Sequence, residues 1–203
     1  MGDVPKSYKA ADVEGRIYDF WMENGYFTPR VDHQKRPFVV IMPPPNVTGE
    51  LHLGHALTAS IEDVLCRWHR MKGEPTLWLP GKDHAGIATQ WVVEKQLATE
   101  GTCRQELGRE KFLERVWEWV GQKGSIIDEQ HKRLGMSCDR SRLSFTLDPG
   151  PSKAVRTTFV NLYAKGLIYR GERIINWCPR CSTALSDLEV EHEVVEGKLY
   201  YIR

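Results

Sequence analysis

The chain has 203 residues, of which 41% are hydrophobic and 27% charged, a composition typical of globular proteins and unlike that of low-complexity chains. Its formal net charge of +1 creates no basic field, so charge alone neither implies nor excludes a nucleic-acid partner. No apolar run approaches the ~20 residues of a membrane span, and the N-terminus lacks the apolar core of a signal peptide. We therefore expect no membrane association.

The cysteines are odd in number and irregularly spaced, which is typical of a reduced chain rather than of a disulfide framework. They are Cys66, Cys103, Cys138, Cys178 and Cys181. This pattern favours a cytoplasmic protein.

The first half of the chain alternates between predicted helices and strands. A helix over 5–28, with a turn near Asn24 and Gly25, precedes the first strand. The elements that follow are a strand at 38–42, a helix at 54–71, a strand at 76–79 and a helix at 87–99. Such alternation predicts an α/β protein with a parallel sheet covered on both faces.

The second half begins with a long amphipathic helix over 108–134, whose apolar side we interpret as a packing surface. Its apolar residues are Phe112, Val116, Trp119, Val120, Ile127 and Leu134. A further helix is predicted at 152–165, followed by strands at 173–177, 189–196 and 198–203.

The most informative stretch is residues 38–55, which read FVVIMPPPNVTGELHLGH. Three prolines end the first strand because proline has no N–H for a sheet ladder, and a loop through Gly49 leads into the next helix. The first N–H groups of a helix are unpaired, so a strand, loop and helix in this order can hold a phosphate. His52 and His55 stand three residues apart at the helix start and can face one ligand.

This order of elements and the sequence His52-Leu53-Gly54-His55 resemble the HIGH signature of class I aminoacyl-tRNA synthetases, with Leu53 in place of isoleucine. The segments PPPNVTGELHLGHALT, LWLPGKDHAGIATQWVVEK, LGREKFLERVWEW and INWCPRCSTALSDLEVE resemble the valyl-tRNA synthetase family, in the same order. The resemblance runs from about residue 10 to the end. It implies a helical extension at 1–37, the first half of a Rossmann-like catalytic core at 38–173, and the truncated start of an inserted editing domain at 174–203.

The resemblance implies that the enzyme joins valine to ATP as valyl-adenylate and then transfers the valyl group to tRNA(Val). His52 and His55 would be the catalytic donors to the phosphates of ATP, which binds with Mg²⁺ as a substrate. The implied ATP-binding residues are Thr48, Gly49, His52, Gly54 and His55, where the missing side chain of Gly54 allows close approach of the nucleotide. The whole signature region comprises Pro45, Asn46, Val47, Thr48, Gly49, Glu50, Leu51, His52, Leu53, Gly54 and His55.

The valine side of the site follows from the same resemblance. Asp83, at the end of the second strand, would hold the α-ammonium group, whereas its alternative role is to cap the following helix. The rigid segment with Pro43, Pro44 and Asn46 would form the wall of the valine pocket. His84 and Gln90 are either ligand contacts or ordinary packing residues.

Cys178 and Cys181 form a CxxC pair, which is half of a zinc site. Related synthetases complete such a site much later in the chain, so we expect Zn²⁺ only in a full-length protein. The second class signature, a KMSKS-like lysine loop, does not occur in these residues. We therefore expect a fragment with negligible activation activity of its own. Separately, we expect it to be a monomer.

Two alternative functions stay open: a piece of an isoleucyl- or leucyl-tRNA synthetase, and a catalytically empty module that only binds a nucleotide. A small free-standing adenylyltransferase is a third, but it leaves the Trp-rich helix and the CPRC segment unexplained. The activation hypothesis requires His52, His55 and the carboxylate of Asp83 to face the same cavity.

Overall fold

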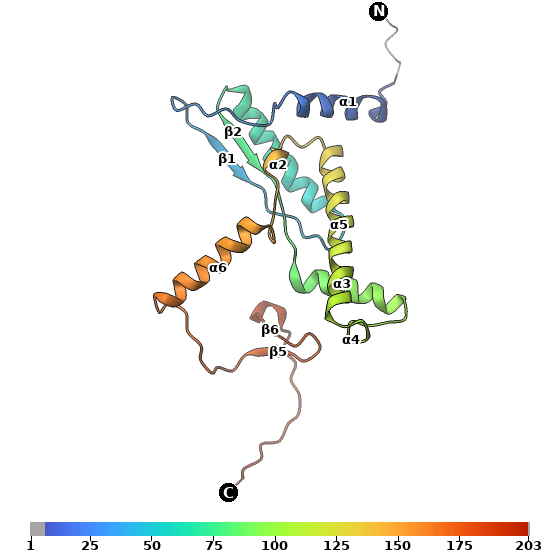
Figure 1. Ribbon diagram of the computed structural model, residues 1–203, viewed down its shortest axis with the longest axis vertical. Coiled ribbons are helices and arrows are strands. Elements are labelled where there is room, and N and C mark those ends of the chain that lie inside the picture. The colour runs from blue at the N-terminus through green and yellow to red at the C-terminus, as the bar shows by residue number, and fades with distance from the viewer. Residues whose placement is uncertain (1–6, 203) are drawn as a thin grey trace, which may run out of the picture. The chain divides into compact units, whose positions relative to one another are not determined.

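The computed structural model describes residues 7–202, and the chain divides into two compact units, residues 1–155 and 156–203 (Figure 1). The first unit contains every predicted site residue except Cys178 and Cys181. The domain limits predicted at 37/38 and 173/174 stay predictions. None of the helices in the described part of the chain is long and apolar enough to cross a membrane.

The first unit is built on two parallel strands joined by a helix. Strands β1 (Phe38–Ile41) and β2 (Thr76–Leu79) pair in parallel, and helix α2 (Leu53–Met71) connects them and packs on one face (Figure 1). The core at this interface consists of Met42, Ala59, Cys66, Trp78, Met136 and Cys138. The predicted strand–helix–strand order and its parallel pairing are therefore confirmed.

The second face of this strand pair is more exposed than the sequence predicts. The continuous apolar run at 38–42 predicts burial on both sides, but Val39 and Ile41 are 53% and 74% exposed. Successive side chains of a strand point to opposite faces, so these two residues lie away from the face that carries Met42. The described part of the first unit buries only the face against α2.

The chain continues past β2 as a further short strand. Strand β3 (Gly81–Lys82) pairs in parallel with β4 (Ser144–Phe145), which follows the short 3-10 helix η1 (Arg140–Arg142). On its other side, Asp83 donates its backbone N–H to Pro45 O at 2.9 Å and accepts from Val47 N at 3.0 Å. The segment 81–83 therefore lies between the site loop and a segment much later in the chain.

Three helices form a second packing layer in the first unit. They are α3 (Gly86–Thr99), α4 (Arg104–Leu107) and α5 (Arg109–Arg133). Their shared core consists of Val93, Leu97 and Phe112, against which Leu107, Val116 and Trp119 pack. The predicted long helix and its role in packing are confirmed, although Leu134 is exposed. Trp119 also donates its indole N–H to Val47 O at 3.0 Å, which ties α5 to the site loop.

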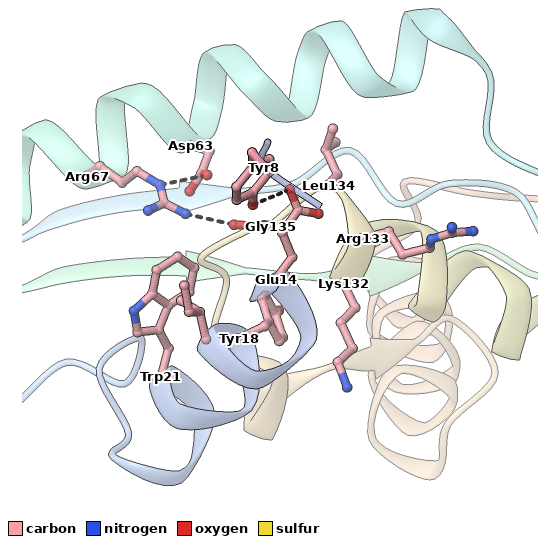
Figure 2. A pocket seen from close by; sticks show the side chains of 11 residues that line it. Tyr8, Glu14, Tyr18, Trp21, Asp63, Arg67, Lys132, Arg133, Leu134 and Gly135 are labelled. Atoms are coloured by element: carbon pink, nitrogen blue, oxygen red, sulfur yellow. Dashed lines mark hydrogen bonds and ion pairs between the residues drawn. The ribbon is translucent and has the colours of Figure 1, made fainter. Parts of the chain in front are cut away.

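The N-terminal helix α1 (Ala10–Glu23) packs on the first unit, as expected. Tyr18 is 3% exposed and donates its hydroxyl to Met136 O at 2.9 Å, while Lys132 of α5 pairs with Asp19 at 2.8 Å. The guanidinium of Arg67 lies over the ring of Trp21, 5.4 Å from its centroid. Figure 2 shows the cavity of about 470 Å³ that these contacts surround. The part of the predicted helix at residues 5 and 6 lies outside the described residues.

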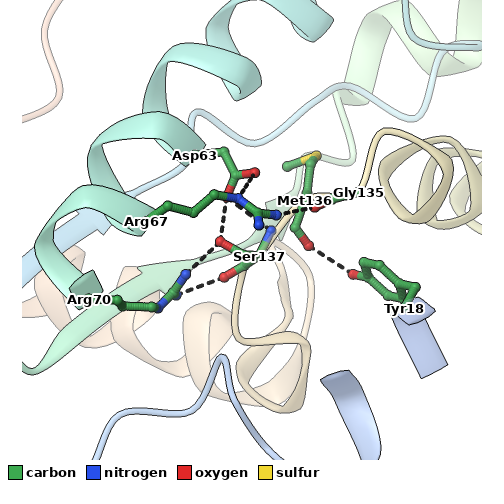
Figure 3. A network of polar contacts seen from close by, with 7 residues as sticks. All are labelled: Tyr18, Asp63, Arg67, Arg70, Gly135, Met136 and Ser137. Atoms are coloured by element: carbon green, nitrogen blue, oxygen red, sulfur yellow. Dashed lines mark hydrogen bonds and ion pairs between the residues drawn. The ribbon is translucent and has the colours of Figure 1, made fainter. Parts of the chain in front are cut away.

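A polar network beneath α1 fixes the segment that follows α5 (Figure 3). Asp63 of α2 accepts hydrogen bonds from the backbone N–H and the hydroxyl of Ser137 and forms an ion pair with Arg67 at 2.8 Å. Arg70 donates to Ser137 O at 2.8 Å, and Arg67 donates to Gly135 O at 2.7 Å. Ser137 is fully buried, so the bonds to its backbone N–H and C=O satisfy groups that have no access to water.

The second unit begins within helix α6 (Pro149–Ala164) and contains a short antiparallel hairpin of β5 (Asn176–Cys178) and β6 (Thr183–Leu185). A 3-10 helix, η2 (Asp187–Glu189), follows. The strands predicted at 189–196 and 198–203 are wrong over the described residues, which have no regular structure from 191 to 202. A strand needs a pairing partner and a surface on which to bury its apolar side chains, and the apolar residues of this segment, such as Val194 and Ile202, are exposed.

Candidate active site

Two histidines cap the N-terminus of α2. His52 is the N-cap residue, and its Nδ1 accepts the backbone N–H of Gly54 at 3.1 Å. His55 accepts the backbone N–H of His52 through its own Nδ1 at 3.3 Å, which completes a reciprocal capping box. An imidazole nitrogen that accepts a hydrogen bond carries no proton, so each neutral ring has its proton on Nε2. Both rings can therefore donate an N–H to a ligand.

The electrostatics of this helix end favour an anion. Burial, followed by the nearby charge of His52, lowers the pKa of His55, so its ring is a neutral donor near pH 7. The two ring centroids lie 4.0 Å apart. The positive end of the helix dipole adds to the same field.

Gly54 has a structural role that differs from the one predicted. A Cβ at this position would lie 2.9 Å from Cε1 and 3.1 Å from Nδ1 of His52. The missing side chain therefore makes room for the capping ring, whereas sequence reasoning explained it by the approach of a nucleotide. The glycine and the histidine are required by the same local geometry.

Two cavities meet at the histidine pair. A pocket of about 170 Å³ is lined by Pro43, Pro45, His52, Gly54 and His55, together with Met42 and His131. A wider groove of about 650 Å³ runs between the start of α2 and the end of α5, and it is also lined by His52, His55 and His131. The pocket thus brings together five of the predicted site residues, and the groove adds Leu51 and Leu53 of the signature region. Thr48 and Gly49 line neither cavity.

His131 is a site residue that sequence reasoning missed. It is 6% exposed, and burial together with the positive charge of Arg140 lowers its pKa to about 4. The signal was present in the sequence, because His131 lies four residues after Ile127 and three before Leu134 on the apolar side of its helix. A polar residue at that position faces the interior of the protein.

Asp83 lies on the neighbouring segment and lines neither of the two histidine cavities. Its Oδ1 accepts hydrogen bonds from Ala85 N at 3.1 Å and from the hydroxyl of Thr146 at 3.2 Å. Helix α3 has Ala85 as its N-cap and no side-chain cap, so Asp83 is not the helix cap that was its alternative role. Asn46 lies directly opposite Asp83 in a parallel bridge.

The three prolines separate the histidine pocket from a second, apolar cavity. Pro43 and Pro45 line the histidine pocket, whereas Pro44 lines a cavity of about 260 Å³ with Ile41, Leu79 and Thr146. Met42 lines both cavities. Of the three residues predicted for the valine wall, Pro43 therefore lines the histidine pocket and Pro44 the apolar cavity, while Asn46 lines neither.

Cys178 and Cys181 lie at the hairpin of the second unit. The backbone N–H of Cys181 donates to the sulfur of Cys178 at 3.5 Å, and this bond is the main cause that lowers the pKa of the Cys178 thiol. Two thiols are half of a tetrahedral zinc ligand set. Among the described residues, no group of three or more histidine, cysteine or acidic side chains could hold a metal ion. The role of the pair in zinc binding stays a prediction.

The parallel strand–helix unit and the paired imidazole donors at its helix start define an α/β protein of the nucleotide-binding class. Comparison with known families agrees with this class. Residues 16–201 match the family described as tRNA synthetases class I (I, L, M and V), and the chain belongs to that family.

Curated relatives narrow the similarity further. The chain is 66% identical over 203 residues to the valine–tRNA ligase of a strain of Dehalococcoides mccartyi, covering 100% of this chain and 23% of the relative. It is 58% identical over 200 residues to the valine–tRNA ligase of Syntrophotalea carbinolica, covering 98% of this chain and 22% of that protein. The chain thus spans less than a quarter of the length of these relatives. The predicted resemblance to valyl-tRNA synthetases is confirmed.

A solved structure supports the fold. The LeuRS of Agrobacterium radiobacter K84, crystallised as a ternary complex with tRNA and LeuAMS, superposes with a TM-score of 0.72 at 22% sequence identity. The match covers 88% of this chain and 21% of the LeuRS chain. The fold class predicted from the sequence, part of a Rossmann-like class I synthetase core, is confirmed.

Proposed function

We propose that this chain carries the part of a valine–tRNA ligase that binds ATP and valine for the activation step. A valine carboxylate oxygen attacks the α-phosphorus of ATP, the bond from that phosphorus to the bridging oxygen breaks, and valyl-adenylate and pyrophosphate form. Transfer of the valyl group to tRNA(Val) follows. The observation that carries this proposal is the capping box of His52 and His55, which leaves two Nε2 donors at one helix start.

The imidazole pair suits the charge that develops in this reaction. Negative charge grows on the oxygens of the phosphate during attack, and donors held in place before the reaction lower the barrier. The wide groove beside the pair, about 650 Å³, falls in the size range of ligand sites. ATP enters this groove as a substrate, with Mg²⁺ bound to its phosphates.

Valine occupies the other side of the Pro-Pro-Pro segment in this proposal. Asp83 receives its ammonium group, and the apolar cavity with Pro44 and Ile41 takes its branched side chain. Asn46, which pairs with Asp83, belongs to the same wall. Met42 lines both cavities, so in this proposal the two substrates occupy neighbouring cavities rather than the single cavity expected from the sequence, and a valyl-adenylate spans both.

Binding of a non-hydrolysable valyl-adenylate analogue, measured by calorimetry on the 203-residue chain, tests the proposal. We expect saturable binding that is weaker for the isoleucyl analogue, together with negligible valine-dependent exchange of ATP and pyrophosphate. Tighter binding of the isoleucyl or leucyl analogue would transfer the assignment to that synthetase. Absence of saturable adenylate binding would overturn the proposed function.

The remaining partners follow from the same proposal. The partners are valine, ATP and tRNA(Val). Because translation occurs in the cytoplasm, we propose that the protein acts there. We propose that the chain is monomeric. Analytical ultracentrifugation at micromolar concentration tests this, and a concentration-dependent dimer would contradict it.

A further inference from the structure

Thr146 contacts Lys82, the last residue of β3, and the two residues that follow it, Asp83 and His84. Its backbone N–H donates to Lys82 O at 3.1 Å, which extends the β3–β4 pairing by one residue. Its hydroxyl lies 3.2 Å from Oδ1 of Asp83 and 2.6 Å from Nδ1 of His84, and it accepts the backbone N–H of His84 at 2.9 Å. One hydroxyl group therefore bridges the candidate ammonium-binding carboxylate and the imidazole next to it, and Nδ1 of His84 also lies 3.3 Å from Oδ1 of Asp83 directly.

The hydrogen atoms can be assigned by counting donors. A threonine hydroxyl has one proton and two acceptor lone pairs. If that proton is donated to the carboxylate of Asp83, the short contact with His84 requires a proton on Nδ1 of the ring. The resulting chain runs from the Nδ1–H of His84 to the oxygen of Thr146, and from its O–H to Oδ1 of Asp83. Every hydrogen-bonding group of the threonine side chain is then satisfied.

This arrangement commits one carboxylate oxygen and leaves the other for a ligand. Oδ1 of Asp83 accepts from both Thr146 and the backbone of Ala85. The side chain of Asp83 is 37% exposed, so Oδ2 can meet an incoming cation. Thr146 also lines the apolar cavity of Pro44 and Leu79, so the carboxylate stands beside space suited to an aliphatic side chain.

We propose that Thr146 and His84 are positioning residues, which orient the carboxylate of Asp83 so that Oδ2 receives the primary ammonium group of an aliphatic α-amino acid. The inference rests on the proposed function, because that function supplies the amino acid. The hydroxyl of Thr146 then has a role beyond packing. His84, for which the sequence left open a ligand contact or a packing role, acts on the ligand only through Asp83.

The substitution Thr146→Val removes the hydroxyl and keeps the shape, while Thr146→Ser keeps the hydroxyl and serves as the matched control. Nitrogen NMR of the imidazoles reports which ring nitrogen of His84 carries the proton. We expect the Nδ1–H form in the wild type and in Thr146→Ser, and a smaller fraction of that form in Thr146→Val, where Oδ1 of Asp83 at 3.3 Å is the remaining acceptor. An unprotonated Nδ1 in the wild type would overturn the proton assignment and the proposal with it. Amide spectra of the three proteins show whether each is folded.

Ligand binding then tests the positioning role separately from the proposed function. The probes are the non-hydrolysable valyl-adenylate analogue and the matching isovaleryl analogue, which lacks the ammonium group. We expect the wild type and Thr146→Ser to prefer the valyl analogue, and Thr146→Val to lose about fivefold to tenfold of that preference. An unchanged preference in Thr146→Val contradicts the positioning role and leaves the adenylate site intact. If the wild type binds neither analogue, the proposed function fails, and so does the inference that rests on it.

Discussion

His131 of α5 shares a cavity with His55 of α2, and burial is the main cause that lowers the pKa of both imidazoles. The groups that shift the pKa of His131 are the cations Arg140 and Lys82, the carboxylate of Asp128, and His55 itself. The three cations or potential cations lower this pKa, and only Asp128 raises it. His131 is therefore a neutral ring at neutral pH, held inside the protein.

The depressed pKa of His131 predicts a loss of stability in acid. Its folded pKa is about 4 and its ordinary value is 6.5, so the unfolded chain binds this proton more readily than the folded one does. The contribution is complete above pH 6.5 and is lost as the pH falls to 4, by up to about 3 kcal/mol. Urea unfolding at several pH values should show a shallower decline for His131→Leu. An equally steep decline in that variant would place the acid sensitivity elsewhere.

The two imidazoles at the start of α2 should contribute separately to adenylate binding. His52→Ala and His55→Ala each remove one donor to a charged phosphate, which predicts a roughly ten- to hundredfold weaker affinity for the valyl-adenylate analogue. Ser60→Ala, on an exposed position of the same helix, is the control and should bind like the wild type. Calorimetric titration measures all three, and wild-type affinity in both histidine variants would remove the phosphate role of the pair.

Gly54→Ala should change the affinity for the valyl-adenylate analogue without much change in stability. Replacing glycine by alanine stabilises a helix by about 1 kcal/mol. The added Cβ would displace the ring of His52, and the loss of its cap would destabilise the helix by about the same free energy. We expect little net change in the free energy of unfolding and a clear loss of analogue affinity. Gly121→Ala in α5, where a Cβ meets no atom within 4 Å, should simply stabilise the chain. A more stable Gly54→Ala variant with normal affinity would contradict the fit between the two residues.

The docking of α1 should depend on the hydroxyl of Tyr18. Tyr18→Phe leaves Met136 O without its donor and predicts a loss of about 1 kcal/mol. Hydrogen exchange of the amides of α1 should accelerate more than that of α2. Tyr8→Phe is the matched control, because Tyr8 is exposed and, among residues 7–202, its hydroxyl bonds to Glu14 of the same segment, so the change should leave exchange unchanged. Equal exchange in Tyr18→Phe and the wild type would show that apolar contacts alone hold the helix.

Local sequence signals predicted the elements around the histidine pair well. The apolar run at Phe38, the three prolines and the glycine of the HIGH signature are short-range features, and β1 and α2 end within about a residue of their predicted limits. The capping geometry of His52 and His55 also depends on neighbours three residues apart. These features need no information from the rest of the chain.

The parts that sequence reasoning missed depend on contacts between distant segments. The pairing of β3 with β4 and the bonds from Thr146 to Asp83 join residues that no local pattern relates. The prediction that the imidazoles of His52 and His55 and the carboxylate of Asp83 face one cavity was wrong for a similar reason. Asp83 lines neither histidine cavity, and its place follows from strand β3, which pairs with a strand much later in the chain.

The strand pairing on both sides of residues 81–83 has a consequence for ligand recognition. A carboxylate on a flexible loop must lose conformational freedom when it captures a cation, and that loss weakens binding. The backbone of Lys82 and Asp83 is already fixed by hydrogen bonds to Thr146, Pro45 and Val47. An amino acid that reaches this carboxylate meets a preorganised receptor, so the entropy lost on binding falls mainly on the ligand.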